Sequence, residues 1–396
     1  MVKDTIPRLQ QLVPHMLDQL KNLREGATFE EVRLSYIATV DRLVSQGQGR
    51  RTASRVNDNE AYWSPAADVL QEAIRLGFVR HQPLPSARRY LDSYRDRRFE
   101  LTNLGFEVSE LAQNDVSGFF DRLADAITHA HPYFKQFLLL LTEAPLICPE
   151  ISEGEIEDGR KQRRTTDDWA RWAAERINAG RDKELVTVAA VKREMRLFVN
   201  RRFGVRPVEK PTSKALAEVL NDAFAATAVR ARGVPMGAME LQILRAWGSQ
   251  LRLLDQSRHV PNHEGSNLVW IASDVERAGE QLRIIRRRVA DLGSAVARSV
   301  VEAYRRQSAS DASNLAAPYL PIYRVRAEAA FECGVTRGLV DIVLEKLANG
   351  DFPELGVQVW LHLGRGDQPP PSEPIFRRAG TRRYQITITT KKEPES

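Results

Sequence analysis

Apolar residues recur at helical intervals through most of the chain, and short alternating stretches interrupt them. Residues 28–46 show this period clearly, and Thr28 with Glu31 has the spacing of a capping box. A second helix is expected over 64–76, with Ser64 as its cap, Pro65 at its first position and Gly77 at its end. The first part of the chain is therefore expected to begin as a set of short helices.

Two short alternating stretches follow these helices, at 78–80 and 98–102, and we expect them to form strands. The second runs through Leu101-Thr102 and Gly105 into a further helix. This order of helices, strand, basic loop, strand and "LTxxG" resembles the winged-helix domains of bacterial DNA-binding regulators. The resemblance covers residues 28–113 and implies that the loop between the strands is a wing.

The loop is rich in arginine, and the resemblance makes it the first candidate for DNA contact. Its candidate residues are Arg88, Arg89, Arg95, Arg97 and Arg98. Such a loop can lie along a phosphate backbone or place arginine in the minor groove. The alternative is a winged helix used for protein contact, in which the arginines only keep the loop in solvent.

Residues 323–348 predict a helix-turn-helix, with Gly334 at the turn and Thr336 capping the second helix. The pattern Ala329-x3-Cys333-Gly334-Val335-Thr336 resembles that of helix-turn-helix proteins. Strands at 355–362 and 383–389 complete a second winged-helix candidate with a long basic connection, 364–382. Its DNA-contact candidates are Thr336, Arg337, Arg377, Arg378, Arg382 and Arg383.

The region between these ends is mostly helical in pattern, although the strand-like residues 268–271 favour a third winged helix over about 212–273. A seven-residue apolar repeat predicts one long helix over 274–306. Its seam comprises Val275, Leu282, Ile285, Val289, Leu292 and Val296. The seam is typical of a dimerisation or partner helix, and equally of a long core helix of the middle domain.

The expected fold class is mainly α, with winged-helix domains at both ends joined by an all-helical middle. An acidic stretch from Glu150 to Asp158 is typical of a solvated linker. The predicted domains are an N-terminal winged helix with flanking helices at 1–147, an acidic linker at 148–164, a helical middle domain at 165–315, and a C-terminal winged helix-turn-helix at 316–396.

Charge strengthens the nucleic-acid interpretation. The net charge is +6, and 47 of the 58 basic residues are arginine, which makes planar two-pronged contacts to phosphate and guanine. Three segments, 75–98, 281–306 and 365–392, each carry a local balance of +5. A GC-rich genome would also raise the arginine content. The positions of the arginines must therefore decide between nucleic-acid binding and a purely compositional origin.

Other function classes lack support in the sequence. No apolar run approaches the roughly 20 residues of a membrane span, and Cys148 and Cys333 are far apart, so we expect a cytoplasmic protein. Neither GxxxxGK[ST] nor a strand-linked GxGxxG occurs, and His259 and His263 flank Pro261 rather than sharing a helix. We therefore expect no cofactor, no metal site and no catalytic role.

The leading hypothesis is a non-catalytic subunit that binds double-stranded DNA through arginine-rich wings. Protein partners, or a homodimer through the 274–306 helix, would place it in a bacterial DNA-processing or genome-defence complex. One alternative is a kleisin-like scaffold that bridges an SMC-type ATPase, since the layout of terminal winged helices is similar. A transcriptional regulator and an enzyme acting on nucleic acid are the others.

Overall fold

The computed structural model describes residues 10–46, 62–81, 97–181, 183–205, 211–278, 281–310, 318–363, 375–378 and 380–390. The described chain is mainly helical, as the sequence predicts. It divides into two compact units. The first comprises Met1–Gln136, Gln242–Leu251 and Glu276–Ile284, and the second comprises Phe137–Leu241, Arg252–Val275 and Ile285–Ser396.

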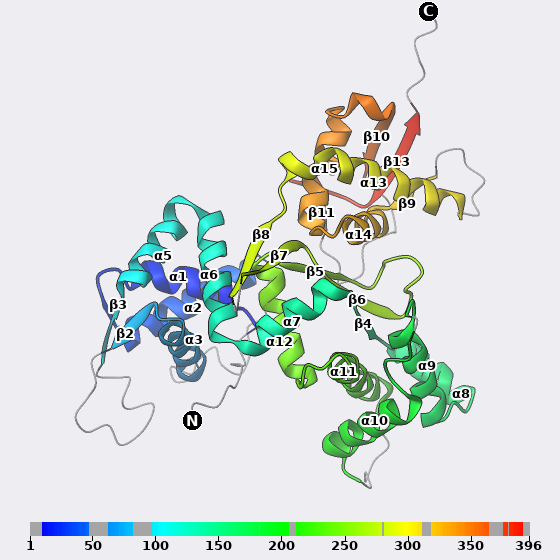
Figure 1. Ribbon diagram of the computed structural model, residues 1–396, viewed down its shortest axis with the longest axis horizontal. Helices are drawn as coiled ribbons and strands as arrows, with labels where there is room; N and C mark the ends of the chain where they lie inside the picture. Colours follow the sequence, from blue (N-terminus) through cyan, green and yellow to red (C-terminus); the bar gives the residue numbers. More distant parts are fainter. Residues whose placement is uncertain are drawn as a thin grey trace, which may run out of the picture. The chain divides into compact units, whose positions relative to one another are not determined.

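The first unit begins with three helices and a small antiparallel sheet, drawn in blue to cyan in Figure 1. The elements in chain order are α1 (Leu12–Asn22), β1 (Ala27–Thr28), α2 (Phe29–Ser45), α3 (Trp63–Arg75), β2 (Val79–His81), β3 (Arg98–Leu101), α5 (Asn103–Asn114) and α6 (Val116–Ala130). The last strand of the sheet lies between the other two, in the order β1-β3-β2. Fully buried Phe29, Phe78 and Phe99 stand at the core of this unit.

The helix boundaries follow the capping signals in one case and depart from them in another. Thr28 and Glu31 form the capping box that the sequence predicts for α2. Helix α3 instead begins at Trp63, one residue before Ser64, and no side chain caps it. It ends as expected before Gly77, whose positive φ of 76° suits glycine.

The "LTxxG" sequence forms the joint between the sheet and α5. Thr102 caps α5 by accepting a hydrogen bond from Gly105 N at 3.0 Å, and its hydroxyl donates to the Gly77 carbonyl at 2.6 Å. A Cβ on Gly105 would lie 2.0 Å from the Phe78 carbonyl oxygen. Glycine is therefore required where α5 passes the end of α3.

The second unit contains a three-stranded sheet that crosses the predicted domain boundaries at 147 and 164. Strand β4 (Leu146–Pro149) pairs with β6 (Ser266–Ile271), which also pairs with β5 (Leu254–Ser257). The order β4-β6-β5 again places the last strand in the middle. The accompanying helices are α8 (Glu153–Lys161), α9 (Thr166–Asn178), α10 (Val188–Phe203) and α11 (Ser213–Arg230). Two further helices, α7 (Pro132–Glu143) and α12 (Ala238–Gln250), have residues in both units.

The expected linker at 148–164 differs from the structure, because this segment holds the end of β4 and helix α8. Glu150 N donates to the Gly265 carbonyl at 2.8 Å, and Glu150 also pairs with Arg258. Ser152 and Glu155 form a capping box at the start of α8. The acidic residues thus begin a helix, where the helix dipole favours negative charge, instead of forming a solvated linker.

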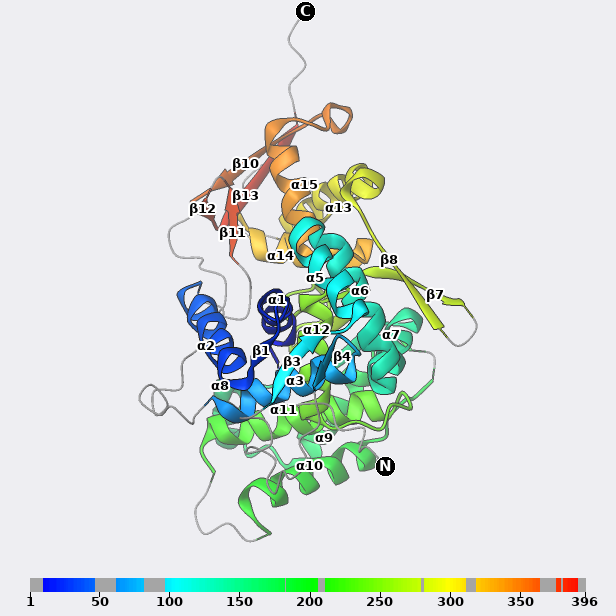
Figure 2. The ribbon, with the colours of Figure 1, turned by 90° about the vertical axis from the view of Figure 1, so that its left-hand side faces the viewer.

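The end of the chain forms a second helical and stranded group within the same unit. Its elements are α13 (Val289–Ala309), β9 (Leu320–Pro321), α14 (Ile322–Cys333), α15 (Arg337–Asn349), a short 3-10 turn η2 (Pro353–Leu355), β10 (Val357–His362), β11 (Phe376–Arg378), β12 (Thr381–Arg383) and β13 (Gln385–Thr390). The sheet order is β10-β13-β9, and Figure 2 shows these strands beside α14 and α15. Helix α13 packs on α14 and α15 and therefore belongs to this C-terminal group. The predicted domain boundary at 315 separates α13 from the rest of the group.

The predicted helix over 274–306 is wrong in its first half. Residues in this part form paired strands β7 (Ser273–Ala278) and β8 (Gln281–Arg286), and α13 begins only at Val289. Leu282 and Ile284 alternate with polar residues, which is a strand period, and Gly279 would cost a helix about 1 kcal/mol relative to alanine.

The seam residues consequently divide between strands and helix. Val275, Leu282 and Ile285 lie on β7 and β8. Val289 and Leu292 are half-buried against the core of the C-terminal group, and Val296 is fully buried in it. The helical part of the seam is therefore core, not a free face for a partner.

Candidate nucleic-acid interface

The first candidate surface is the basic loop between β2 and β3. Arg88, Arg89 and Arg95 lie outside the described residues. Arg97 is half-buried, and its Nη1 lies 3.0 Å from Nε2 of His81 on the opposite strand. Exposed Arg98 donates through Nη2 to the Glu25 carbonyl at 3.2 Å. These two arginines therefore anchor the end of the loop to the body of the domain.

Helix α3, which precedes this loop, offers little positive charge of its own. Its polar side chains that are exposed or half-buried, Ser64, Asp68, Gln71 and Arg75, share one face at helical spacing. Arg75 lies 3.6 Å from Glu72, and burial raises the pKa of Asp68 above its usual range. The positive charge near this helix is concentrated in the loop.

The second candidate surface is the helix-turn-helix, and its local geometry follows the sequence prediction. Helix α14 ends at Cys333, and Gly334 makes the turn with a φ of 57°. Thr336 caps α15 by accepting a hydrogen bond from Leu339 N at 3.3 Å. The threonine hydroxyl is thereby engaged at the helix start.

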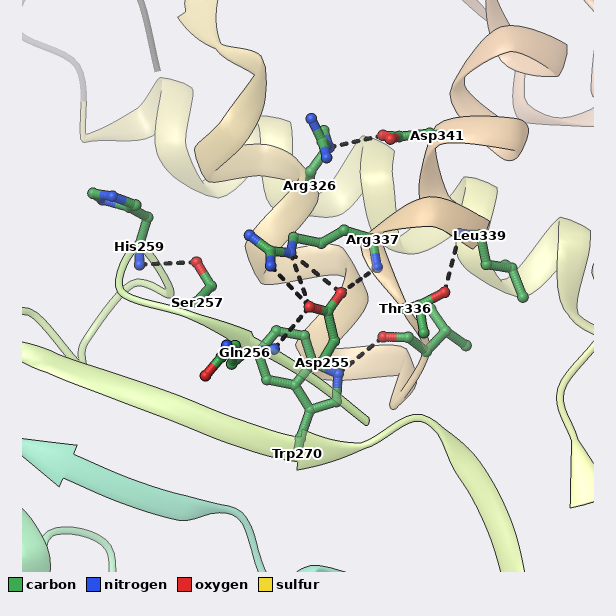
Figure 3. Close-up of polar contacts among 11 residues, drawn as sticks. Asp255, Gln256, Ser257, His259, Trp270, Arg326, Thr336, Arg337, Leu339 and Asp341 are labelled. Atoms are coloured by element: carbon green, nitrogen blue, oxygen red, sulfur yellow. Dashed lines mark hydrogen bonds and ion pairs between the residues drawn. The ribbon is translucent and has the colours of Figure 1, made fainter. Parts of the chain in front are cut away.

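A carboxylate from the β4-β6-β5 sheet occupies the beginning of α15, as Figure 3 shows. Asp255 of β5 accepts a hydrogen bond from the backbone N of Arg337 at 2.6 Å and another from its Nη2 at 2.8 Å. Arg337 is 7% exposed and Asp255 is 8% exposed. The aspartate therefore satisfies the free N–H and the charge of Arg337 together.

Two further side chains fasten the same turn. The indole Nε1 of Trp270 on β6 donates to the Val335 carbonyl at 2.9 Å. Arg287 donates through Nη1 to the carbonyls of Cys333 and Gly334 at 2.9 and 2.5 Å. Its Nη2 pairs with Asp274 at 2.7 Å. The turn is thus held against the sheet by three side chains from outside the helix-turn-helix.

These contacts change the list of candidate DNA residues. In helix-turn-helix proteins, residues near the start of the second helix contact the bases. Here Arg337 is buried in an ion pair and Thr336 caps its own helix. Arg337 is therefore not presented to a ligand, and Thr336, which is half-buried, uses its hydroxyl as a helix cap. No sequence signal marks Asp255, whose partner is 82 residues away.

A second, half-buried ion pair lies one turn further along α15. Arg326 of α14, only 1% exposed, lies with its Nε 2.7 Å from Oδ1 of Asp341. Burial raises the pKa of Asp341 to about 6, although Arg326 and Arg337 oppose this shift. Two arginines and two aspartates therefore form one largely buried charged group between α14, α15 and β5, in which Asp341 is the most exposed member (Figure 3).

The β11–β12 hairpin, Phe376–Arg383, is the third candidate surface. It contains four arginines and no carboxylate. Arg377 and Arg382 are exposed, and Arg378 donates to Oδ1 of Asn349 at 2.6 Å. Arg383 is half-buried, and Phe376 anchors the hairpin in the core. Arg377 and Arg382 are the hairpin cations best placed to meet a ligand.

Other chemistry is not evident in the described part of the chain. Among those residues there is no group of three or more His, Cys, Asp and Glu side chains that could hold a metal ion. None of the described helices is long and apolar enough to cross a membrane. Comparison of the chain with protein-family models, curated proteins and solved structures gives no match to any of the three.

Proposed function

We propose that this chain binds double-stranded DNA through arginine-rich hairpin loops on winged-helix domains at its two ends. The observation that carries the proposal is the element order shared by the two ends. Counting the strands of its three-stranded sheet, each end runs helix, strand, helix, helix, strand, strand, and the last strand lies between the other two; at the C-terminal end the β11–β12 hairpin is inserted before that last strand. In each, a basic segment joins the last two strands, where a winged helix has its wing.

The proposed contacts are made to the phosphate backbone of the duplex and not to base edges. Helix α3 carries little charge on its exposed face, and the start of α15 is covered by Asp255. The arginines of the two loops are left as the main candidates, and phosphate contacts from arginine carry no sequence information directly. We therefore propose an accessory or architectural subunit with weak sequence preference.

The experiment measures the affinity of the full chain for a labelled duplex at about 50 and about 200 mM salt. A loop variant replaces Arg88, Arg89 and Arg95 with alanine. It leaves Arg97 and Arg98, which anchor the loop, in place. The matched control replaces three exposed arginines of α10, Arg196, Arg201 and Arg202, so both variants lose the same charge.

Counterion release predicts the size of the effect. Each lost phosphate contact reduces the slope of log affinity against log salt by about 0.9, so the loop variant should lose up to about 2.7. The control should keep the wild-type slope. Equal losses in both variants would mean that net charge alone causes binding, and absence of wild-type binding at low salt would overturn the proposal.

A further inference from the structure

The outer face of the β10-β13-β9 sheet carries aromatic side chains in solvent. Val359 and Leu361 of β10 point into the core, so Trp360 and His362 lie on the opposite face. Trp360 is 50% exposed, and Tyr319, just before β9, is 55% exposed. The Tyr319 and His362 rings lie 4.8 Å apart, which places both on the same face.

The same face contains polar atoms without partners in the described part of the chain. Thr387, the residue opposite Trp360 on β13, has a buried hydroxyl with no hydrogen bond there. The same holds for Nε2 of His362 and Nε of Arg383. Tyr384 N, next to Arg383 in the chain, donates to the His362 carbonyl at 3.0 Å, and burial and the charge of Arg383 lower the pKa of His362. Buried polar groups ordinarily have partners, so these three atoms set this part of the sheet apart from an ordinary core.

Positive charge borders the aromatic face. The β11–β12 hairpin leads directly into β13, because only Tyr384 separates Arg383 from Gln385. Its exposed Arg377 and Arg382 provide cations without a carboxylate in the hairpin. Aromatic rings on a sheet, with arginines just beyond the start of its central strand, match an anionic ligand that has flat apolar rings.

We infer that this face binds single-stranded nucleic acid, with bases stacked on Trp360 and Tyr319 and phosphates near Arg377 and Arg382. Stacking on exposed aromatic rings requires unpaired bases, since the faces of bases in a duplex are already covered. This inference shares Arg377 and Arg382 with the duplex proposal, but its own evidence is the aromatic face.

The test uses labelled single strands of about 15 thymidines or 15 uridines and a duplex of equal length. Trp360→Ala and Tyr319→Ala should each weaken single-strand binding by about tenfold, and Trp360→Phe should keep most of the affinity because it retains a ring. Ile342→Ala is the matched control, since Ile342 is 50% exposed on α15 and outside this sheet. Comparing thymidine with uridine strands distinguishes DNA from RNA as the source.

Duplex binding separates this inference from the proposed function. Trp360→Ala should leave duplex affinity unchanged, and the Arg88, Arg89 and Arg95 variant should leave most single-strand affinity intact. Unchanged single-strand binding in Trp360→Ala would overturn the inference. So would an equal loss for single strand and duplex, which would reflect damage to the fold rather than loss of stacking.

Discussion

At the residue scale, the Asp255–Arg337 pair is expected to be a large single contributor to the stability of the second unit. Asp255→Ala would remove the carboxylate that pairs with the buried Arg337 guanidinium, and breaking a buried ion pair in this way costs about 3–5 kcal/mol in unfolding free energy. Urea unfolding of the full chain, followed by tryptophan fluorescence, should show the second unit losing structure at a lower concentration.

The control is the Asp274–Arg287 pair, in which the Asp274 side chain is 53% exposed. Asp274→Ala should cost less than about 1 kcal/mol, as exposed pairs usually do. Replacing both members of the buried pair, with Asp255→Ala and Arg337→Met, should restore part of the loss. If Asp255→Ala costs no more than Asp274→Ala, the buried pair does not hold α15 to the sheet.

Asp341 predicts a pH dependence of stability with a definite sign. Its pKa is raised from 3.8 to about 6 in the folded chain, so between these values the folded state binds more protons than the unfolded state. The stability contributed by Asp341 is present below about pH 4 and is lost as the pH rises through 6. Unfolding measured at pH 4.5, 5.5 and 7 should show wild type losing stability relative to Asp341→Asn as the pH rises, because asparagine stays neutral like the protonated aspartate. A difference independent of pH would contradict the raised pKa.

At the element scale, Gly105 is expected to control how α5 joins the first sheet. Gly105→Ala would place a methyl group 2.0 Å from the Phe78 carbonyl oxygen, so backbone must move, at a cost of about 3 kcal/mol or more. Thermal unfolding should show a loss of that order in the first unit. Gly154→Ala in α8 is the control, because its Cβ meets nothing within 4 Å and alanine favours the helix. If Gly105→Ala and Gly154→Ala unfold at similar temperatures, Gly105 does not control how α5 joins the first sheet.

Local signals predict the elements well, whereas contacts between distant residues escape them. Thr28, Gly77, Gly334 and Thr336 mark helix ends because capping depends on neighbours only a few residues away. Asp255 cannot be found in this way, since its role depends on a strand packing beside a distant helix. The apolar repeat over 274–306 predicted a partner helix for a related reason. Val296 is apolar because it is buried in the core, and residue spacing alone does not distinguish a core helix from a helix that binds a partner.

At the scale of the whole molecule, one strand order recurs along the chain. The sheets β1-β3-β2, β4-β6-β5 and β10-β13-β9 each place their last strand between the earlier two. In the middle sheet, helices α8 to α12 separate the first strand from the second. This sheet lies beside the α14–α15 turn through Asp255 and Trp270, so its role in the structure is to cover the start of α15.

This arrangement predicts how the two basic hairpins contribute to duplex binding. If both contact one duplex, removing Arg377 and Arg382 should reduce the salt slope by up to about 1.8, and combining them with Arg88, Arg89 and Arg95 should reduce it by up to about 4.5. The additivity would hold because each arginine releases its own counterions. A combined variant no weaker than the first-loop variant would instead assign duplex binding to the first unit alone, and would leave the C-terminal hairpin to the single-stranded ligand.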